Sequence, residues 1–227
     1  MKYSFLLTTI IFISFTTAFA QKEHTDADKD SSYTRVITQR AEKIVSPLGI
    51  PDTKKAARVQ NIIIGQYRHL NEIYAERDAQ KKALKADTTQ SKDVVSAGLL
   101  KIDESTTNKI DLLHKEYIKA LAKELNEEQI DKVKDGMTYG VLEVTYNAYL
   151  DMLPDLTTQQ KAQIMTWLVE AREHAMDGES SEKKHAWFGK YKGRINNYLS
   201  AAGYDMKKAG EEWQKRKNAA AANKAAK

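Results

Sequence analysis

The chain has 227 residues, of which 30% are charged, with three prolines, no cysteine and a formal net charge of +5 at pH 7. This length fits one domain with a real hydrophobic core, and the lack of cysteine excludes a fold held together by disulfides. Lysine is interleaved with aspartate and glutamate, so we interpret the charge as a solvated surface of mixed sign and expect no nucleic-acid partner. A modest preference for acidic partners, such as uronate-containing glycans, stays open.

The first twenty residues, 1–20, have the pattern of a secretory signal peptide. Lys2 supplies the positive charge, an apolar run mixed with Ser and Thr follows, and Ala18 and Ala20 place small residues where signal peptidase reads them. We expect cleavage before Gln21, which leaves a net charge of +4 and an exported, periplasmic and soluble mature protein. The apolar run is too short for a comfortable membrane span, and no cysteine stands at the cleavage point, so no membrane anchor is expected.

Two long amphipathic helices are predicted in the first half of the mature chain. Residues 21–32 are polar and without apolar periodicity, so we expect a disordered lead-in there, followed by a short amphipathic helix over 33–45. Asp52 is a good N-cap for the first long helix, whose periodicity lasts to about Arg77. A polar loop is expected over 85–93, before the second. The residues predicted to be buried on the two helices are Val59, Ile63, Tyr67 or Gln66, Leu70 and Tyr74, and then Leu99, Ile102, Thr106, Ile110, Leu113, Tyr117, Leu121 and Leu125.

Two capping boxes mark later helix starts. Asn126 precedes Gln129 by three residues, and Thr157 precedes Gln160 by three, a spacing at which each side chain satisfies a free amide of the first helical turn. Two well-capped helix starts need no function to explain them.

The segment between the two boxes is ambiguous in sequence. Asp135-Gly136 is expected to end the first of these helices. Residues 137–150 combine the β-branched and aromatic composition of a strand with apolar spacing that also fits one helix face. The length of the segment and its helical neighbours favour a helix.

The remaining chain is predicted to be helical over 157–177, 181–202 and from 206 to Trp213, followed by an Ala- and Lys-rich tail over 214–227. The sequence therefore predicts an all-α fold, a bundle-like single domain over 33–213 in which only 137–150 is open to an irregular or strand conformation.

The strongest candidate site lies on the predicted helix over 181–202. An aromatic platform beside cations and amides suits a sugar, whose C–H face stacks on rings while its hydroxyls and carboxylates accept hydrogen bonds. Core filling is the competing explanation for the aromatic residues, and Phe188 is assigned to the core outright. The predicted ligand-binding residues are His185, Trp187, Lys190, Tyr191, Arg194 and Asn197.

Gly189 and Gly193 lie four residues apart on the same helix, and each costs about 1 kcal/mol of helix stability relative to alanine. Close helix packing is the common reason for such glycines, and close approach by a ligand is the alternative.

Secondary candidates for the same cleft are Tyr139, Tyr146, Glu170 and Arg172. The preceding helix also carries Trp167 and His174, both assigned structural or surface roles, because two histidines on one face with a glutamate between them, as in zinc sites, are absent. No nucleotide-binding, CxxC or EF-hand pattern occurs either. We therefore expect no metal and no other cofactor, and no catalytic residue is assigned.

The runs VKDGMTYGVLEVTYNAYLDMLPDLT and AREHAMDGESSEKKHAWFGKYKGRINNYLSAAGYD resemble a family of exported bacterial proteins, the domain of unknown function numbered 3826. The likeness covers most of the mature chain and is most specific between Lys134 and Tyr204. It implies a setting in polysaccharide-degrading Gram-negative bacteria, often near pectin-utilisation genes. Sugar binding has been suggested for the family, and the likeness carries no catalytic residues.

A looser likeness concerns Leu156-Thr157-Thr158-Gln159-Gln160, which is similar to the LTxxQ signature of the small helical Spy-type periplasmic chaperones. The sequence thus predicts an exported accessory protein that binds acidic plant-type oligosaccharides, with processing of them left open. The alternatives are a Spy-like ATP-independent chaperone and a polysaccharide lyase or glycoside hydrolase.

Overall fold

A computed structural model describes residues 26–225 of the chain and the side chains of residues 31–222. The chain divides after Arg35 into two compact units, and the described residues of the first unit are the start of helix α1 (Asp26–Val45). Residues 26–32 are therefore helical rather than a disordered lead-in. The predicted signal peptide and residues 21–25 lie outside the described residues.

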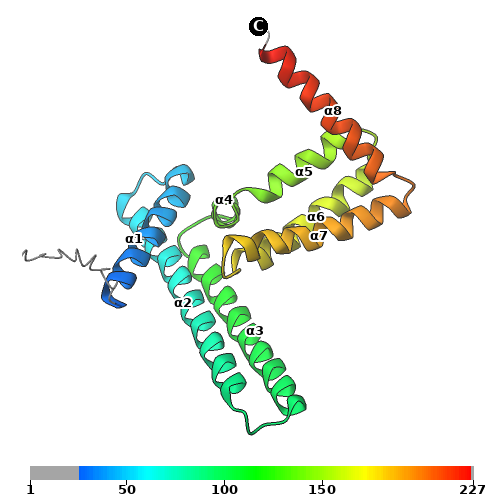
Figure 1. Cartoon of the computed structure of the whole chain (residues 1–227). Coiled ribbons are helices and arrows are strands. Elements are labelled where there is room, and N and C mark those ends of the chain that lie inside the picture. The colour runs from blue at the N-terminus through cyan, green and yellow to red at the C-terminus, as the bar shows by residue number, and fades with distance from the viewer. Residues whose placement is uncertain (1–25, 226–227) are drawn as a thin grey trace, which may run out of the picture. The chain divides into compact units, whose positions relative to one another are not determined.

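All regular structure in the described part of the chain is helical, which confirms the all-α prediction (Figure 1). After α1 come the 3₁₀ turn η1 (Ser46–Leu48) and the helices α2 (Thr53–Ala86), α3 (Lys92–Ala122), α4 (Glu127–Met137), α5 (Val141–Met152), α6 (Thr158–Met176), α7 (Ser181–Ala201) and α8 (Met206–Ala225). Among the described residues, no helix is long and apolar enough to cross a membrane.

The predicted caps are confirmed. The Asp52 carboxylate accepts the backbone N–H of Lys54 at 2.8 Å, and α4 and α6 both begin with complete capping boxes. In the second box Gln160 Oε1 accepts the backbone N–H of Thr157 at 2.8 Å. Local hydrogen bonding therefore fixes where these helices start.

The ambiguous segment 137–150 is a turn followed by helix α5, and not a strand. Helix α4 ends at Met137 and not at Asp135-Gly136. The chain turns through Tyr139 and Gly140, both left-handed with φ of 59° and 65°. A left-handed tyrosine is uncommon because its Cβ crowds the backbone, whereas glycine adopts this conformation freely.

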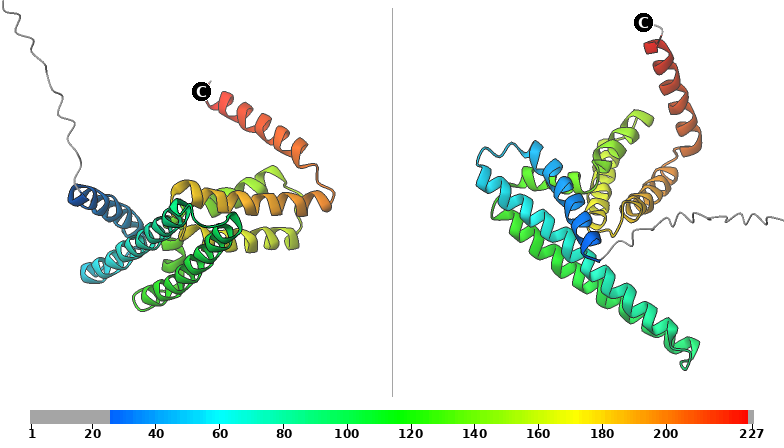
Figure 2. Two further views of the ribbon diagram at one scale, coloured as in Figure 1. Left: turned by 60° about the horizontal axis from the view of Figure 1, so that its bottom comes forward. Right: turned by 60° about the vertical axis from the view of Figure 1, so that its left-hand side comes forward.

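Helices α2 and α3 run antiparallel, side by side in each view (Figure 2). The buried face of α2 consists of Val59, Ile63, Gln66 and Leu70, which confirms the alternative with Gln66. Helix α2 continues past Arg77 to Ala86. No residue between 71 and 105 is buried, so the half of the hairpin nearest its loop has only a two-helix interface.

Two hydrophobic clusters form the core of the second unit. The first joins the last turns of α1 to η1, α2, α3 and α4, and Met176 at the end of α6 belongs to it. The second is built from α5, α6 and α7, with the start of α8 packed against it. The fully buried Phe188 confirms its assignment to the core.

A buried lysine closes the junction between the clusters. Lys184 Nζ donates to the carbonyl oxygens of Met176 at 2.7 Å and Met137 at 3.1 Å, which are the last residues of α6 and α4. Burial lowers the pKa of Lys184 to about 8. Gly178 is required beside it, because a Cβ there would lie 2.9 Å from Lys184 Cγ.

The last helix includes most of the predicted tail. Asp205 accepts the backbone N–H of Lys208 at 2.9 Å, as its predicted capping role requires. Arg216 Nη2 donates to the carbonyl oxygen of Asp151 at 2.9 Å, which holds α8 against the end of α5. Residues 214–225 are therefore a continuation of α8, and the side chains of 214–222 are all exposed.

Candidate functional site

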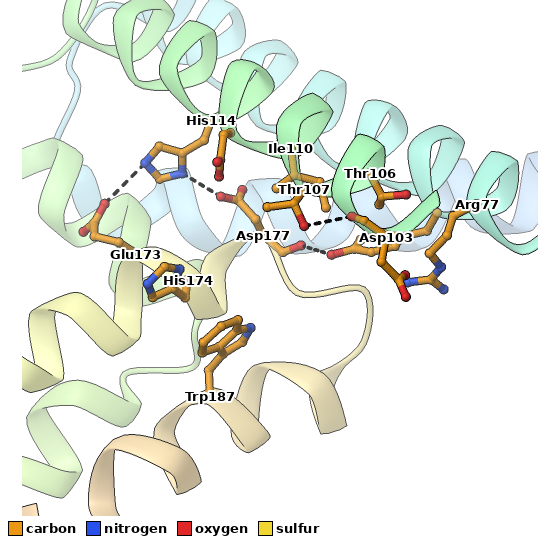
Figure 3. A pocket seen from close by; sticks show the side chains of 12 residues that line it. Arg77, Asp103, Thr106, Thr107, Ile110, His114, Glu173, His174, Asp177 and Trp187 are labelled. Carbon is orange, nitrogen blue, oxygen red and sulfur yellow. Dashed lines mark hydrogen bonds and ion pairs between the residues drawn. The ribbon is translucent and has the colours of Figure 1, made fainter. Parts of the chain in front are cut away.

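A cavity of about 590 Å³ lies where the α2–α3 hairpin meets the end of α6 and the start of α7 (Figure 3). Its volume falls in the range of pockets that hold small ligands. Polar side chains from α3 and α6 face aromatic ones from α6 and α7 across it. The lining residues are Tyr74, Arg77, Asp103, Thr106, Thr107, Ile110, Asp111, His114, Glu173, His174, Asp177 and Trp187.

His114 holds two carboxylates together at one wall of this cavity (Figure 3). Its Nδ1 lies 2.6 Å from Asp177 Oδ2, and its Nε2 lies 3.6 Å from Glu173 Oε2. Hydrogen bonding to Asp177 and to Glu173 raises the pKa of His114 to about 9. The imidazole is therefore a cation at neutral pH and links α3 to the last turn of α6.

Both carboxylates have further partners. Gln66 Nε2 donates to Asp177 Oδ1 at 3.0 Å, which explains why an amide is buried on α2. Lys134 Nζ lies 2.9 Å from Glu173 Oε2. Burial alone would raise the pKa of Glu173, but hydrogen bonds from His114 and Lys134 hold it at about 2. The network ties four helices to the rim of the cavity.

The opposite wall is aromatic. His174 stacks on Trp187 with ring centroids 4.5 Å apart and planes 17° from parallel. Lys190 Nζ lies 5.0 Å from the centroid of the Trp187 ring. His174, which was predicted to have a structural or surface role, is exposed in the last turn of α6 and also lines the cavity.

From this wall a row of side chains continues along the edge where α6 and α7 pack. We call this row the aromatic seam: Trp167, Glu170 and His174 of α6, and Trp187, Tyr191, Arg194 and Tyr198 of α7.

Contacts follow one another along the aromatic seam. The rings of His174 and Tyr191 lie 6.3 Å apart. The guanidinium of Arg194 lies 4.6 Å from the centroid of Trp167, and Arg194 Nη1 lies 3.4 Å from Glu170 Oε2. Such cation–π contacts stabilise the guanidinium against the ring face and preorganise it. The seam therefore presents rings and cations alternately.

Three predicted ligand residues, Trp187, Lys190 and Arg194, lie together on this edge. Tyr191 contributes to the seam but is only 6% exposed, so its core role predominates. Burial and the neighbouring Glu170 carboxylate raise its pKa to about 12.

His185 does not join them. At 3.6 residues per turn, it projects from the side of α7 opposite to Trp187. Its ring stacks on Tyr139 with centroids 5.9 Å apart. Asn197 is exposed, and its side chain has no hydrogen-bond partner among the described residues.

Two secondary candidates serve the fold. Arg172 is 5% exposed and pairs with Asp135 at 2.9 Å and Asp131 at 2.6 Å, which ties α6 to α4. Its guanidinium is therefore engaged within the fold, and it does not line the cavity. Tyr146 is partly buried against the second cluster.

The two glycines of α7 have open surroundings. A Cβ added at Gly189 or Gly193 would meet nothing within 4 Å, so close helix packing does not explain either residue. Both positions are exposed. The explanation by close packing is wrong, and the one by ligand approach stays a prediction.

The side chains that α3 contributes to the cavity were not predicted from the sequence. His114 and Asp111 occur in a helix whose periodicity points to packing, and no motif distinguishes them from solvated side chains. His114 lies 63 residues before Asp177 in sequence, so only the tertiary structure brings them together. No group of three or more potential metal ligands occurs in the described part of the chain.

A model of the family described as "Protein of unknown function (DUF3826)" matches residues 34–219 of the chain. None of the curated proteins compared with it matches. The matched range contains both the cavity and the aromatic seam. The sugar-binding setting and the likeness to Spy-type chaperones stay predictions.

Proposed function

The chain belongs to the DUF3826 family, whose description names no ligand or reaction, and we propose from its geometry that it binds acidic oligosaccharides along the aromatic seam. The observation that carries this proposal is the pairing of each seam tryptophan with a cation. Lys190 lies over Trp187, and Arg194 lies over Trp167. Such a surface offers ring faces for sugar C–H groups and donors for carboxylates.

The spacing of the seam suits a chain ligand rather than a single compact molecule. From Trp187 to Tyr198 the helix advances about 16 Å at 1.5 Å per residue. Trp187 also lines the cavity, so the seam leads into the cavity at one end. An oligosaccharide can therefore lie along α6 and α7 with one residue at the cavity.

The charges of the seam favour an acidic ligand. Arg194 and Glu170 are 54% and 47% exposed, and an exposed pair at 3.4 Å contributes little to stability. A uronate carboxylate can therefore replace Glu170 as the partner of Arg194. Helix α7 as a whole carries five Lys or Arg residues and one acidic residue, which adds long-range attraction.

Isothermal titration of the mature protein with a panel of oligogalacturonides and neutral oligosaccharides tests this proposal. Arg194→Ala removes a charged donor, and we expect it to weaken binding of an oligogalacturonide by about tenfold or more. Lys192→Ala is the matched control, because it removes an exposed cation from another side of α7.

Absence of binding to every glycan by a folded sample would contradict the proposal. Trp187→Ala adds a second criterion. If this variant mainly unfolds the protein, Trp187 is a core residue and the stacking hypothesis fails.

The alternative functions gain less from the structure. The LTxxQ-like segment forms the start of helix α6. Leu156 is buried, and Gln160 belongs to the capping box. A Spy-like chaperone would suppress client aggregation at near-stoichiometric amounts, which an aggregation assay measures. The hypothesis of a lyase or hydrolase using His185 and Arg194 requires both at one bond, yet they project from opposite sides of α7.

A further inference from the structure

The cavity and the aromatic seam have opposite charge character. Two cations line the cavity, Arg77 and His114, against four carboxylates: Asp103, Asp111, Glu173 and Asp177. Each cation already has two carboxylate partners. His114 contacts Asp177 and Glu173, whereas Arg77 contacts Asp78 at 2.6 Å and Glu179 at 3.0 Å.

One carboxylate of the cavity, that of Asp111, is accessible and has unused capacity to accept hydrogen bonds. Asp111 is exposed and has no hydrogen-bond or ion-pair partner among the described residues. Glu173 Oε1 also lacks a hydrogen bond, but this atom is buried 3.6 Å from Arg172 Nη2 and is not exposed to a ligand. Asp103, by contrast, pairs with Lys81. Among the described residues that line it, the cavity thus offers a carboxylate acceptor and has no unpaired cation.

The aromatic wall sets the shape of the group that fits. The stacked pair of His174 and Trp187 presents flat apolar surface, and Ile110 adds an aliphatic contact from α3. Flat apolar surface beside carboxylate acceptors suits a saturated ring whose edge carries hydrogen-bond donors. A carboxylate placed there would meet Asp111 and Glu173 without a cation to offset the repulsion.

We propose that the cavity is a subsite for a sugar residue that donates hydrogen bonds and carries no carboxylate. This inference rests on the proposed function, because the acidic residues of the same oligosaccharide lie along the seam. The protein would then recognise a mixed chain, with a neutral or amino sugar at the cavity and uronates beyond it. Hydroxyl and ammonium groups share the required chemistry, which is donation of a hydrogen bond to Asp111.

Titration calorimetry with four kinds of trisaccharide separates these possibilities. The reference is trigalacturonate. Two probes have the carboxylate of one terminal residue reduced to a primary alcohol, one for each end of the chain. The fourth kind carries a 2-amino sugar at one terminus. This terminus is the one whose reduction gives the tighter binding of the two reduced probes.

The mature wild-type protein should bind one reduced isomer at least about fivefold tighter than trigalacturonate, because one like-charge contact is removed. In Asp111→Lys a cation replaces the free carboxylate, so this preference should vanish or reverse. Glu104→Lys is the matched control, since it makes the same charge change at an exposed position of α3 outside the cavity, and it should keep the preference. Tighter binding of the amino sugar than of the alcohol also supports the subsite and assigns it an ammonium.

Two outcomes would overturn the subsite alone: equal affinity of both reduced isomers and trigalacturonate, or a preference that survives in Asp111→Lys. In each of them the proposed function stands, because the oligosaccharides still bind. Lack of binding by all four kinds of probe would overturn both proposals.

Discussion

The two long antiparallel helix pairs of this protein, α2–α3 and α6–α7, differ in what surrounds them. Helices α6 and α7 bury side chains along their whole length, from Ile164 to Met176 and from Lys184 to Leu199, because α5 packs beside them and the end of α4 meets Met176 and Lys184. The α2–α3 pair buries none between 71 and 105. Amphipathic sequence therefore suffices to make a helix pair, but a third element is needed to make a core.

The difference also explains where the cavity lies. The cavity opens where the buried part of the α2–α3 hairpin ends, beside the junction at Asp177 and Lys184. Polar groups gather there because the free carbonyl groups at the ends of α4 and α6 and the imidazole of His114 all need hydrogen-bond partners in one place. The wall formed by α6 and α7 is backed by the second cluster, whereas the hairpin wall near Tyr74 and Thr106 has fewer buried neighbours.

The largest expected effect comes from comparing one apolar side chain from each pair, Phe188 in the core and Leu84 outside it. Phe188→Ala should destabilise the protein by about 3–5 kcal/mol, because it leaves a cavity in a fully packed core. Leu84→Ala, in the half-exposed part of α2, should cost about 1 kcal/mol or less, because water already reaches the site. Urea unfolding measures both. Equal losses would show that the far half of the hairpin is packed as tightly as α6–α7.

The second prediction concerns the link between the pairs. The folded-state pKa of His114 is raised to about 9, so its stabilisation is complete below the unfolded value of 6.5 and is lost as pH rises towards 9. Lys184, with a pKa lowered to about 8, acts in the opposite direction above pH 8. Between pH 6.5 and 8 the free energy of unfolding should therefore fall by up to about 2 kcal/mol.

Denaturant titrations at several pH values measure this slope, and His114→Gln should remove it while retaining polar contact. A slope that persists in His114→Gln belongs to another group. Glu173 provides the acid counterpart: its pKa is lowered to about 2, so its stabilisation is present above 4.5 and is lost as pH falls towards 2.

The smallest expected effect is the change in stability when a glycine of each helix pair, Gly189 or Gly98, is replaced by alanine. Gly189→Ala should stabilise the protein by about 0.5–1 kcal/mol, because alanine favours the helix and nothing lies within 4 Å of the new Cβ. Gly98→Ala should gain less, because its Cβ would lie 2.7 Å from Leu84 Cδ2 and must displace that side chain. Thermal unfolding of both variants measures the difference. A loss at Gly189 would show that the position is not open.

Much of the fold was predictable from local sequence. Asp52, Asn126 and Thr157 begin helices because each satisfies amides of the next turn, and apolar spacing identifies the faces that bury Val59 and Tyr117. The errors fall at boundaries where neighbours intervene. Helix α4 continues through Met137, whose side chain is buried in the first cluster, past a glycine that was expected to stop it.

The candidate site was predictable only in part. Helical spacing alone placed Trp187, Lys190 and Arg194 on one edge of α7. Spacing within one helix gives no information about contacts with other helices. It therefore could not predict that Arg172 pairs with Asp135 of α4 or that Asp111 of α3 lines the cavity.

The sequence by itself determined the helices, their caps and the aromatic and cationic edge of α7, because each depends on residues within a few positions of one another. Only the tertiary structure decided that His114 contacts Asp177, that Arg172 is spent on α4, and that the aromatic seam ends at a cavity lined with carboxylates. These features depend on contacts between side chains far apart in the chain. Burial, and not sequence spacing, sets which of them are free to meet a ligand.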